Sequence, residues 1–383
     1  MEGYREWAEQ TLDRIVKKLV IVAQRNQGKI PYTTNGEGRY DDKSDEAASF
    51  RIDDGINWWT NGFWGGILWT LYQETGEEQY IQMARESMNK MEKGFQMFYG
   101  LHHDVGFMFQ PTAVLDYRLT GSEGARRIAL RAANFLAGRF NPAGRFIRAW
   151  NDIEEKDTRG WAIIDCLFNL SILYWASEET KDPRFCQVAV SHADTVMKNF
   201  VREDGSVCHI VEFDPHTGRR LCEHGGQGYS VGSAWTRGQG WALYGFVNSY
   251  AHTGKREYLD TAIRVAEYCM QCIPENGIVP VDFRQPTEPS WEDSCVACII
   301  AGGLLQLSKH VGKVDKERYF TAAVRILRAI AEHRADWTSE CDAIVQNCSG
   351  EYHSKHHHFT MVYADYFFLE ALLELAGRGN DVW

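Results

Sequence analysis

Apolar and polar positions along this chain form repeated pairs of amphipathic segments. In each pair, a segment rich in aromatic and apolar residues runs into a short polar break, and a second amphipathic segment follows. The breaks lie at residues 75–80, 120–125, 180–185, 253–258 and 314–319, and three of them begin with Thr-Gly. A helix that ends at Thr-Gly and restarts a few residues later is an antiparallel helical hairpin. The pattern therefore predicts an array of such hairpins.

The 3.6-residue apolar period predicts twelve helices. They cover residues 4–25, 62–74, 77–98, 106–119, 122–139, 162–178, 183–201, 235–252, 255–272, 292–308, 315–335 and 360–377. Six hairpins close naturally into an all-α (α/α)₆ toroid with an inner and an outer layer. The last helix is nearly all apolar, which fits the inner layer and not the polar cap of an open solenoid. Because stacked hairpins share one core, residues 1–383 are expected to form a single domain.

Long connections without helical periodicity separate the hairpins. Because the breaks within hairpins are short, these connections are predicted to gather at one rim and to wall a pocket. Residues 206–218 within them suggest a small β-hairpin. The connections are residues 27–60, 140–160, 202–234, 273–290 and 336–359.

Charge and composition narrow the classes of partner. The formal net charge of −11 and the lack of a basic run argue against nucleic acid, although a local basic pocket could still bind an anionic substrate. The charged start Met-Glu-Gly-Tyr-Arg has no apolar signal-peptide core, and no stretch of 18 apolar residues predicts a membrane span. The ten cysteines lie mostly in apolar helical patterns, which is typical of reduced thiols and a cytoplasmic protein.

Two acids interrupt otherwise apolar surroundings. Asp165 stands between Ile164 and Cys166, where desolvation would raise its pKa, and Asp104 follows two histidines. Either side chain could instead cap a helix. Both acids begin predicted inner helices, so they are expected to face the same rim. Paired acids in a cavity with aromatic walls are typical of glycosidic-bond chemistry.

A second candidate group lies in the segment 233–241. Arg237 precedes Trp241 by four residues and shares a helix face with it. A guanidinium suits a carboxylate, and an indole suits a sugar ring. The alternative is an arginine that holds a loop carbonyl beside a core tryptophan.

Two patterns resemble metal sites without matching one. Cys269-x-x-Cys272 and Cys295-x-x-Cys298 lie within apolar helices, and their spacer of 22 residues exceeds the usual range for zinc. The histidines at 353 and 356–358 lie in a polar loop, where incidental histidines are the better interpretation. No metal and no cofactor are expected.

Four long motifs occur in order at residues 59–69, 102–107, 163–170 and 235–241. Together with residues 350–352 and 366–372, they resemble the unsaturated glucuronyl hydrolases of glycoside hydrolase family 88. The resemblance covers essentially the whole chain.

The resemblance implies a cytoplasmic (α/α)₆-barrel enzyme that needs no metal. Its substrates would be oligosaccharides that a polysaccharide lyase leaves with a 4,5-unsaturated uronic acid at the non-reducing end. Such enzymes hydrate the C4=C5 double bond, and the unstable hemiketal opens and expels the remaining sugar.

Carried over to this chain, Asp165 matches the general acid/base of the family. Asp104 matches a second aspartate that holds ring hydroxyls and helps to keep Asp165 protonated. The other matching positions would contact the sugar: Trp59, His103, Trp150, His209, Gln227, Arg237, Trp241 and Tyr352.

One departure bears on the substrate. Family members that prefer sulfated glycosaminoglycan units resemble one another in a Ser-x-x-Ser-x-Lys pattern. Here Glu351 stands in place of the first Ser, and His356 in place of the Lys. A carboxylate there would repel sulfate, so substrates poor in sulfate are expected.

Three alternatives stay open. An unsaturated rhamnogalacturonyl hydrolase shares the barrel, and a sugar isomerase or epimerase could use His102 and His103 as acid and base. A non-catalytic carbohydrate-binding scaffold would gain nothing from a buried Asp165. The chain could be a monomer or a homodimer.

Overall fold

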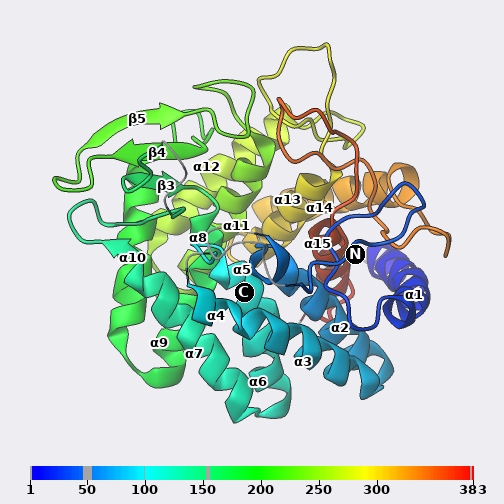
Figure 1. Cartoon of the computed structure of the whole chain (residues 1–383). Coiled ribbons are helices and arrows are strands. Elements are labelled where there is room, and N and C mark those ends of the chain that lie inside the picture. Colours follow the sequence, from blue (N-terminus) through cyan, green and yellow to red (C-terminus); the bar gives the residue numbers. More distant parts are fainter. Residues whose placement is uncertain (1, 46–53, 99, 152–155, 380–381) are drawn as a thin grey trace.

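The computed structural model describes residues 2–45, 54–98, 100–151, 156–379 and 382–383. Within this part of the chain the helices form two layers around a common centre (Figure 1). The inner segments are α2 (Asn61–Thr75), α5 (Val105–Phe109) continued by a π-helical turn (Gln110–Val114) and α6 (Leu115–Thr120), α8 (Cys166–Asn169) continued by α9 (Ser171–Thr180), α11 (Thr236–Thr253), α13 (Ser294–Ser308) and α15 (Val362–Leu375). The outer helices are α1 (Glu2–Arg25), α3 (Gln79–Glu92) with α4 (Gly94–Met97), α7 (Glu123–Gly138), α10 (Pro183–Asn199), α12 (Arg256–Cys272) and α14 (Lys313–His333).

The two layers differ in their sequence pattern. Nearly every residue of α13 is buried, which requires an apolar surface on all sides. The outer helix α12 buries one stripe only and turns its charged residues to solvent. The last helix, α15, packs against α13, α1 and α2 and so closes the ring. These features confirm the (α/α)₆ toroid.

The hairpin turns follow the predicted breaks at four of five places. The inner helices end in a left-handed residue at Gly76, Gly121, Lys181 and Gly254, each at its predicted break. The fifth prediction was wrong by several residues. The break at 314–319 falls within the first two turns of α14, and the actual turn precedes Lys313.

Two predicted inner helices are interrupted. Residues 110–114 widen into a π-helical turn because Pro111 has no N–H to donate there. The predicted helix at 162–178 was wrong at its start, where Trp161–Ile163 form strand β3 and the helix begins only at Cys166. Strand β3 is possible because the long connection from residue 202 onward supplies a partner strand.

The strands lie in the long connections. β1 (Phe140–Asn141) pairs with β2 (Phe146–Ile147), and β3 pairs antiparallel with β4 (Ile210–Phe213), which pairs with β5 (Arg220–His224). The β4–β5 pair confirms the predicted hairpin. A short 3₁₀ turn covers Gly55–Asn57, while residues 46–53 and 152–155 of the predicted connections lie outside the described part.

The sheet and the long loops gather along the upper side of Figure 1, and hairpin turns lie along the lower side. One mouth of the barrel is therefore built by connections, as predicted. No helix in the described ranges is both long and apolar enough to cross a bilayer.

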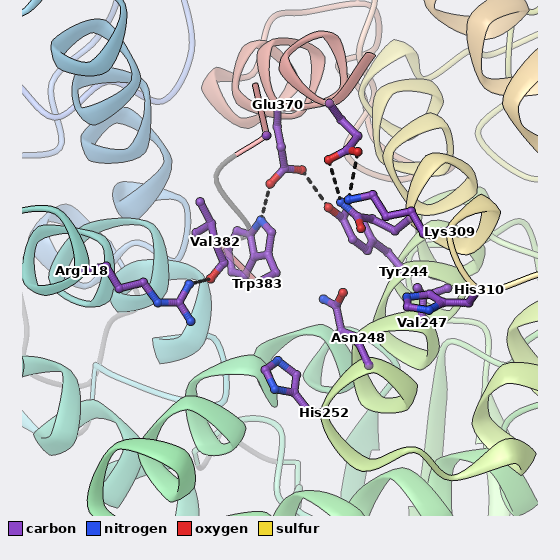
Figure 2. A pocket seen from close by; sticks show the side chains of 14 residues that line it. Arg118, Tyr244, Val247, Asn248, His252, Lys309, His310, Glu370, Val382 and Trp383 are labelled. Atoms are coloured by element: carbon purple, nitrogen blue, oxygen red, sulfur yellow. Dashed lines mark hydrogen bonds and ion pairs between the residues drawn. The ribbon is translucent and has the colours of Figure 1, made fainter. Parts of the chain in front are cut away.

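The opposite mouth is closed by Trp383, whose indole nitrogen donates to Glu370 (Figure 2). A cavity of about 400 Å³ remains there between the ends of α11, α13 and α15. Two of its basic side chains have partners: Arg118 donates to the Val382 carbonyl and Lys309 pairs with Glu374. We interpret this end as a structural floor, because Arg118, Lys309, Tyr244 and Trp383 hold neighbouring groups of the same cavity.

Candidate active site

Each inner helical segment starts beside a residue that faces the loop-covered mouth. α2 follows Trp59, α5 follows Asp104, and α8 follows Asp165. The other three begin at or next to Trp235, Asp293 and Tyr363. The barrel thereby brings residues from six distant parts of the sequence to one end.

Asp165 precedes α8 and is 8 % exposed. Its side chain makes no capping hydrogen bond, so the alternative of a helix cap was wrong. Burial raises the pKa of Asp165 to about 8, and the nearby Asp104 carboxylate adds to the rise. Arg237 and the Trp241 indole offset part of it. Asp165 therefore carries a proton near neutral pH.

Asp104 lies in a polar cluster instead. Its Oδ1 is 3.1 Å from His103 Nε2, and its Oδ2 is 3.4 Å from His102 Nδ1. Burial alone would raise the pKa of Asp104, but the two histidines and a hydrogen bond from Asn169 hold it below its ordinary value. Asp104 makes no capping hydrogen bond either, so that alternative was also wrong. One acid is ionised, and the other is protonated.

Asn169 links the two acids. Its Nδ2 donates to Asp104 Oδ1 at 3.0 Å and to the Asp165 carbonyl at 3.1 Å, and its Oδ1 accepts from the Phe107 N–H at 2.7 Å. Gly106 permits this approach, because a Cβ there would lie 2.6 Å from the Asn169 carbonyl oxygen. The amide thus fixes the start of α8 against the start of α5.

His209, the residue just before β4, faces Asp165. Its Nδ1 accepts from the Gln227 N–H at 2.9 Å, which leaves the ring proton on Nε2. Burial and the charge of Arg237 lower the pKa of His209 to about 3, so the ring is neutral. Its Nε2–H lies 3.8 Å from Asp165 Oδ2. A Cβ on Gly226 would overlap the ring, so only glycine lets the Gln227 backbone reach it.

Arg237 is 2 % exposed and already well bonded. Its guanidinium donates to Asp293, to the Ser349 carbonyl at 2.9 Å and to the Gly350 carbonyl. Gln227 Nε2 donates to the same Gly350 carbonyl at 2.9 Å. Arg237 therefore holds the loop 349–352 over the mouth, and its charge acts on the site from below that loop.

Tyr352, in the same loop, donates its backbone N–H to the Gln227 carbonyl at 2.9 Å. Its ring lies 4.9 Å from that of Tyr229. The loop and the turn 225–228 therefore support each other, and both carry candidate sugar contacts.

The predicted aromatic walls differ in accessibility. Trp59 is half-buried and packs on Tyr363 at 4.9 Å, and Trp150 is half-buried with its ring 6.1 Å from His103. Trp241 is fully buried among Phe107 and other core rings, so it lies beneath the site and offers no open stacking surface for a sugar.

Unpaired polar atoms mark the place where a ligand would sit. Within the described residues, Asp165 Oδ2, His209 Nε2 and the indole nitrogen of Trp235 are buried without a hydrogen-bond partner. Glu370 offers a contrast, since burial raises its pKa to about 8 as well. Its carboxyl, however, accepts from Trp383 at 2.6 Å and interacts with two tyrosine hydroxyls. Glu370 is a buried acid whose oxygens are satisfied within the fold, whereas Asp165 keeps an oxygen available for a ligand.

Reasoning from the sequence missed Asn169, Asp293 and Trp235. The available signal for Asn169 was an amide inside the apolar run Cys-Leu-Phe-Asn-Leu, and Asp293 stands just before the apolar run of α13. Trp235 lies only two residues before Arg237, and its ring is 4.2 Å from that of His209.

Comparison with known proteins identifies the family of this chain. A family model described as Glycosyl Hydrolase Family 88 matches residues 25–375. Unsaturated glucuronyl hydrolase from Bacillus sp. (strain GL1) is 35 % identical over 354 residues, which span 90 % of this chain and 93 % of that protein. Unsaturated chondroitin disaccharide hydrolase from Streptococcus pneumoniae is 31 % identical over 85 % of this chain and 83 % of its own length.

The fold is equally similar. A crystal structure of the Bacillus sp. GL1 unsaturated glucuronyl hydrolase, responsible for the degradation of glycosaminoglycan, superposes with a TM-score of 0.88 at 32 % identity. The match covers 96 % of both chains. The protein is therefore a glycoside hydrolase, and it belongs to Glycosyl Hydrolase Family 88.

Proposed function

We propose that this enzyme removes the 4,5-unsaturated uronic acid from the non-reducing end of oligosaccharides that lyases release from glycosaminoglycans. One observation carries the proposal: a buried, protonated Asp165 with an unpaired oxygen lies beside an ionised Asp104. The relatives are named for unsaturated glucuronyl and chondroitin disaccharide substrates, which supports the same reaction.

The protonated Asp165 would donate its proton to C4 of the enol ether, and the positive charge that develops at C5 would be shared with the ring oxygen. The resulting carboxylate would then accept a proton from the water that attacks C5. Asp165 regains its proton, and one water has been added across the double bond. The hemiketal at C5 opens, and the rest of the sugar leaves.

The neighbouring groups would tune and orient this step. Asp104 supplies negative charge that holds the proton on Asp165, and it can accept hydrogen bonds from ring hydroxyls. His209 offers a neutral N–H donor directed at the reacting centre. Arg237 would favour the uronate carboxylate through its charge, because three of its contacts are already taken by the protein. Turnover is expected to fall as the pH rises through about 8.

Ultraviolet absorbance of an unsaturated hyaluronan or chondroitin disaccharide tests the proposal directly. The conjugated C4=C5 carboxylate absorbs, so hydration removes the band. We expect a steady loss of absorbance in the presence of EDTA. Asp165→Asn is expected to remove nearly all turnover and to keep substrate binding.

Glu370→Gln is the matched control, since it also replaces a buried acid with a raised pKa but at the opposite mouth. This variant is expected to keep turnover. A flat absorbance trace with the wild type on sulfated and unsulfated disaccharides would contradict the proposal. Substantial turnover by Asp165→Asn would remove Asp165 from its role.

Two other activities predict different products. An unsaturated rhamnogalacturonyl hydrolase would turn over the products of a pectin lyase in preference to those of a hyaluronan lyase. An isomerase would release product without consuming the double bond. His102 and His103 both contact Asp104, which favours their use in holding that carboxylate.

The substrate is proposed to be poor in sulfate, because Glu351 is exposed on the loop that covers the mouth. Glu351→Ser should then raise the ratio of sulfated to unsulfated turnover, and an unchanged ratio would end this expectation. All ten cysteines are unpaired, which supports action in the cytoplasm.

A further inference from the structure

Three side chains that can bind a metal meet on one face of the β4–β5 hairpin. Glu212 on β4 stands directly opposite Cys222 on β5, and His224 follows two residues later on the same face. The register shifts beside the Glu212–Cys222 pair, where Leu221 is the extra residue of a bulge. Bulges of this kind re-aim neighbouring side chains.

The three ligand atoms already lie close to the spacing that zinc requires. Cys222 Sγ is 3.5 Å from Glu212 Oε2 and 3.7 Å from His224 Nε2. Tetrahedral zinc with normal bond lengths places sulfur about 3.6 Å from either of the other two atoms. The remaining pair, His224 Nε2 and Glu212 Oε2, is hydrogen-bonded at 2.7 Å and would open to about 3.4 Å around the ion.

We propose that Glu212, Cys222 and His224 form a binding site for a thiophilic divalent cation, with zinc as the best fit. A set of one thiolate, one imidazole and one carboxylate is borderline soft, which favours zinc over magnesium or calcium. Three protein ligands leave the fourth position to water or to another donor.

The site is open to an ion from solvent and has a rigid support. The side chains of Glu212 and His224 are 29 % and 33 % exposed, and Cys222 is exposed. The Trp161 ring stacks on His224 at 4.5 Å, and Trp161 pairs with Glu212 across β3 and β4. This apolar wall fixes the imidazole and shields one side of the ion.

Binding requires a defined rearrangement of protons. The Cys222 thiol donates to Glu212 in the metal-free hairpin, and it loses that proton to buffer when sulfur binds the cation. In the metal-free hairpin the Nε2–H of His224 donates to Glu212. Binding moves the ring proton to Nδ1 through solvent, which frees the Nε2 lone pair for the ion. The hydrogen bond between His224 and Glu212 is replaced by two bonds to the ion.

The position links the cation to the candidate active site without placing it there. Trp161 contacts Trp150 at 6.2 Å, and Trp150 contacts His103 at 6.1 Å. His224 also stands three residues before Gln227, which contacts His209. A bound cation would thus fasten the outer strand of the wall that carries these residues.

One other cluster in the described ranges gathers three potential ligands, namely His102, His103 and Asp104. His103 Nδ1 is bonded to the Ala149 carbonyl, and Asp104 is bonded to Asn169. That cluster contains no sulfur, so thiolate spectroscopy separates the two sites.

Titration of the untagged full-length protein with cobalt(II) tests the proposal. We expect thiolate-to-cobalt charge-transfer absorption in the near ultraviolet, and its loss when one equivalent of zinc is added. Cys222→Ser should abolish the band, and His224→Gln should weaken it strongly. Cys186→Ser replaces another partly exposed cysteine, on α10, and should leave the band unchanged.

Metal analysis after dialysis against equimolar zinc gives a second readout. The expected result is one zinc per wild-type chain and none per Cys222→Ser chain. No charge-transfer band in the wild type, or an undiminished band in Cys222→Ser, would overturn the proposal. Zinc retained by Cys222→Ser and lost by His103→Ala would place the metal at the other cluster and overturn it too.

Discussion

Asp165→Asn is expected to change the pH dependence of folding stability as well as turnover. Burial raises the pKa of Asp165 from 3.8 to about 8 in the folded state. A carboxyl with a raised folded pKa destabilises the fold wherever the unfolded chain would be ionised. At neutral pH the difference is roughly three pKa units at 1.36 kcal/mol each, so the cost is on the order of 4 kcal/mol.

The sign and the pH window follow from these two pKa values. Below about pH 4 both states are protonated, and the cost vanishes. Between about pH 4 and about pH 8 the wild type loses up to about 1.4 kcal/mol of stability per pH unit relative to Asp165→Asn. Above about pH 8 the difference is constant. If the asparagine amide finds no hydrogen-bond partner, its burial lowers the free energy of unfolding of the variant by about 1–3 kcal/mol. The change of stability with pH is therefore a cleaner measure than the stability difference at one pH.

Urea unfolding followed by tryptophan fluorescence, at several pH values between about 5 and about 8, measures this slope. Glu351→Gln removes one negative charge from an exposed loop and controls for net charge. Glu370→Gln should reproduce the slope while keeping turnover, because Glu370 has a similar raised pKa. Parallel stability curves for the wild type and Asp165→Asn would refute the assignment of a proton to Asp165.

Three further outcomes are expected. Asp104→Asn should lower kcat and move the alkaline limb of its pH profile to lower pH, because Asp104 supports the proton on Asp165; an unmoved limb would count against this coupling. Asn169→Ala should reduce turnover and lower the free energy of unfolding in urea by about 1–3 kcal/mol, since the Phe107 N–H loses its acceptor. Wild-type turnover and stability would show that Asn169 does not hold the two helix starts together. Trp383→Ala should lower the free energy of unfolding in urea by about 3–5 kcal/mol, because its ring packs on core aromatics and its nitrogen donates to the buried Glu370. A loss of stability under about 1 kcal/mol would contradict its role in closing that mouth of the barrel.

The fold could be predicted because its signals are local. Each inner helix is apolar on all sides and each outer helix on one stripe, so periodicity alone distinguishes and orders them. The π-helical turn at 110–114 and strand β3 could not be predicted this way. The first depends on how Pro111 is accommodated, and the second on a partner strand far along the chain.

The residues of the candidate site also differ in how far the local sequence could identify them. Asp165 could be singled out because a lone acid in an apolar run is unusual anywhere. Asn169 is likewise a polar residue in an apolar run, but its role could not be predicted because its partners lie 62 and 65 residues away. Arg237 left two interpretations open, and the structure shows the arginine that holds loop carbonyls beside a core tryptophan. Those carbonyls belong to Ser349 and Gly350, which lie 112 and 113 residues further on. Contacts between distant helix starts are invisible to a local pattern.

The shared orientation of the inner helices has an electrical consequence. Every inner segment begins at the mouth that carries the acids, so the positive ends of their macrodipoles converge there, each equivalent to roughly half an elementary charge. The chain as a whole carries a net charge of −11. Backbone dipoles can therefore attract an anionic sugar into one end of an otherwise repulsive molecule. Preference for an anion would then survive the loss of any single basic side chain.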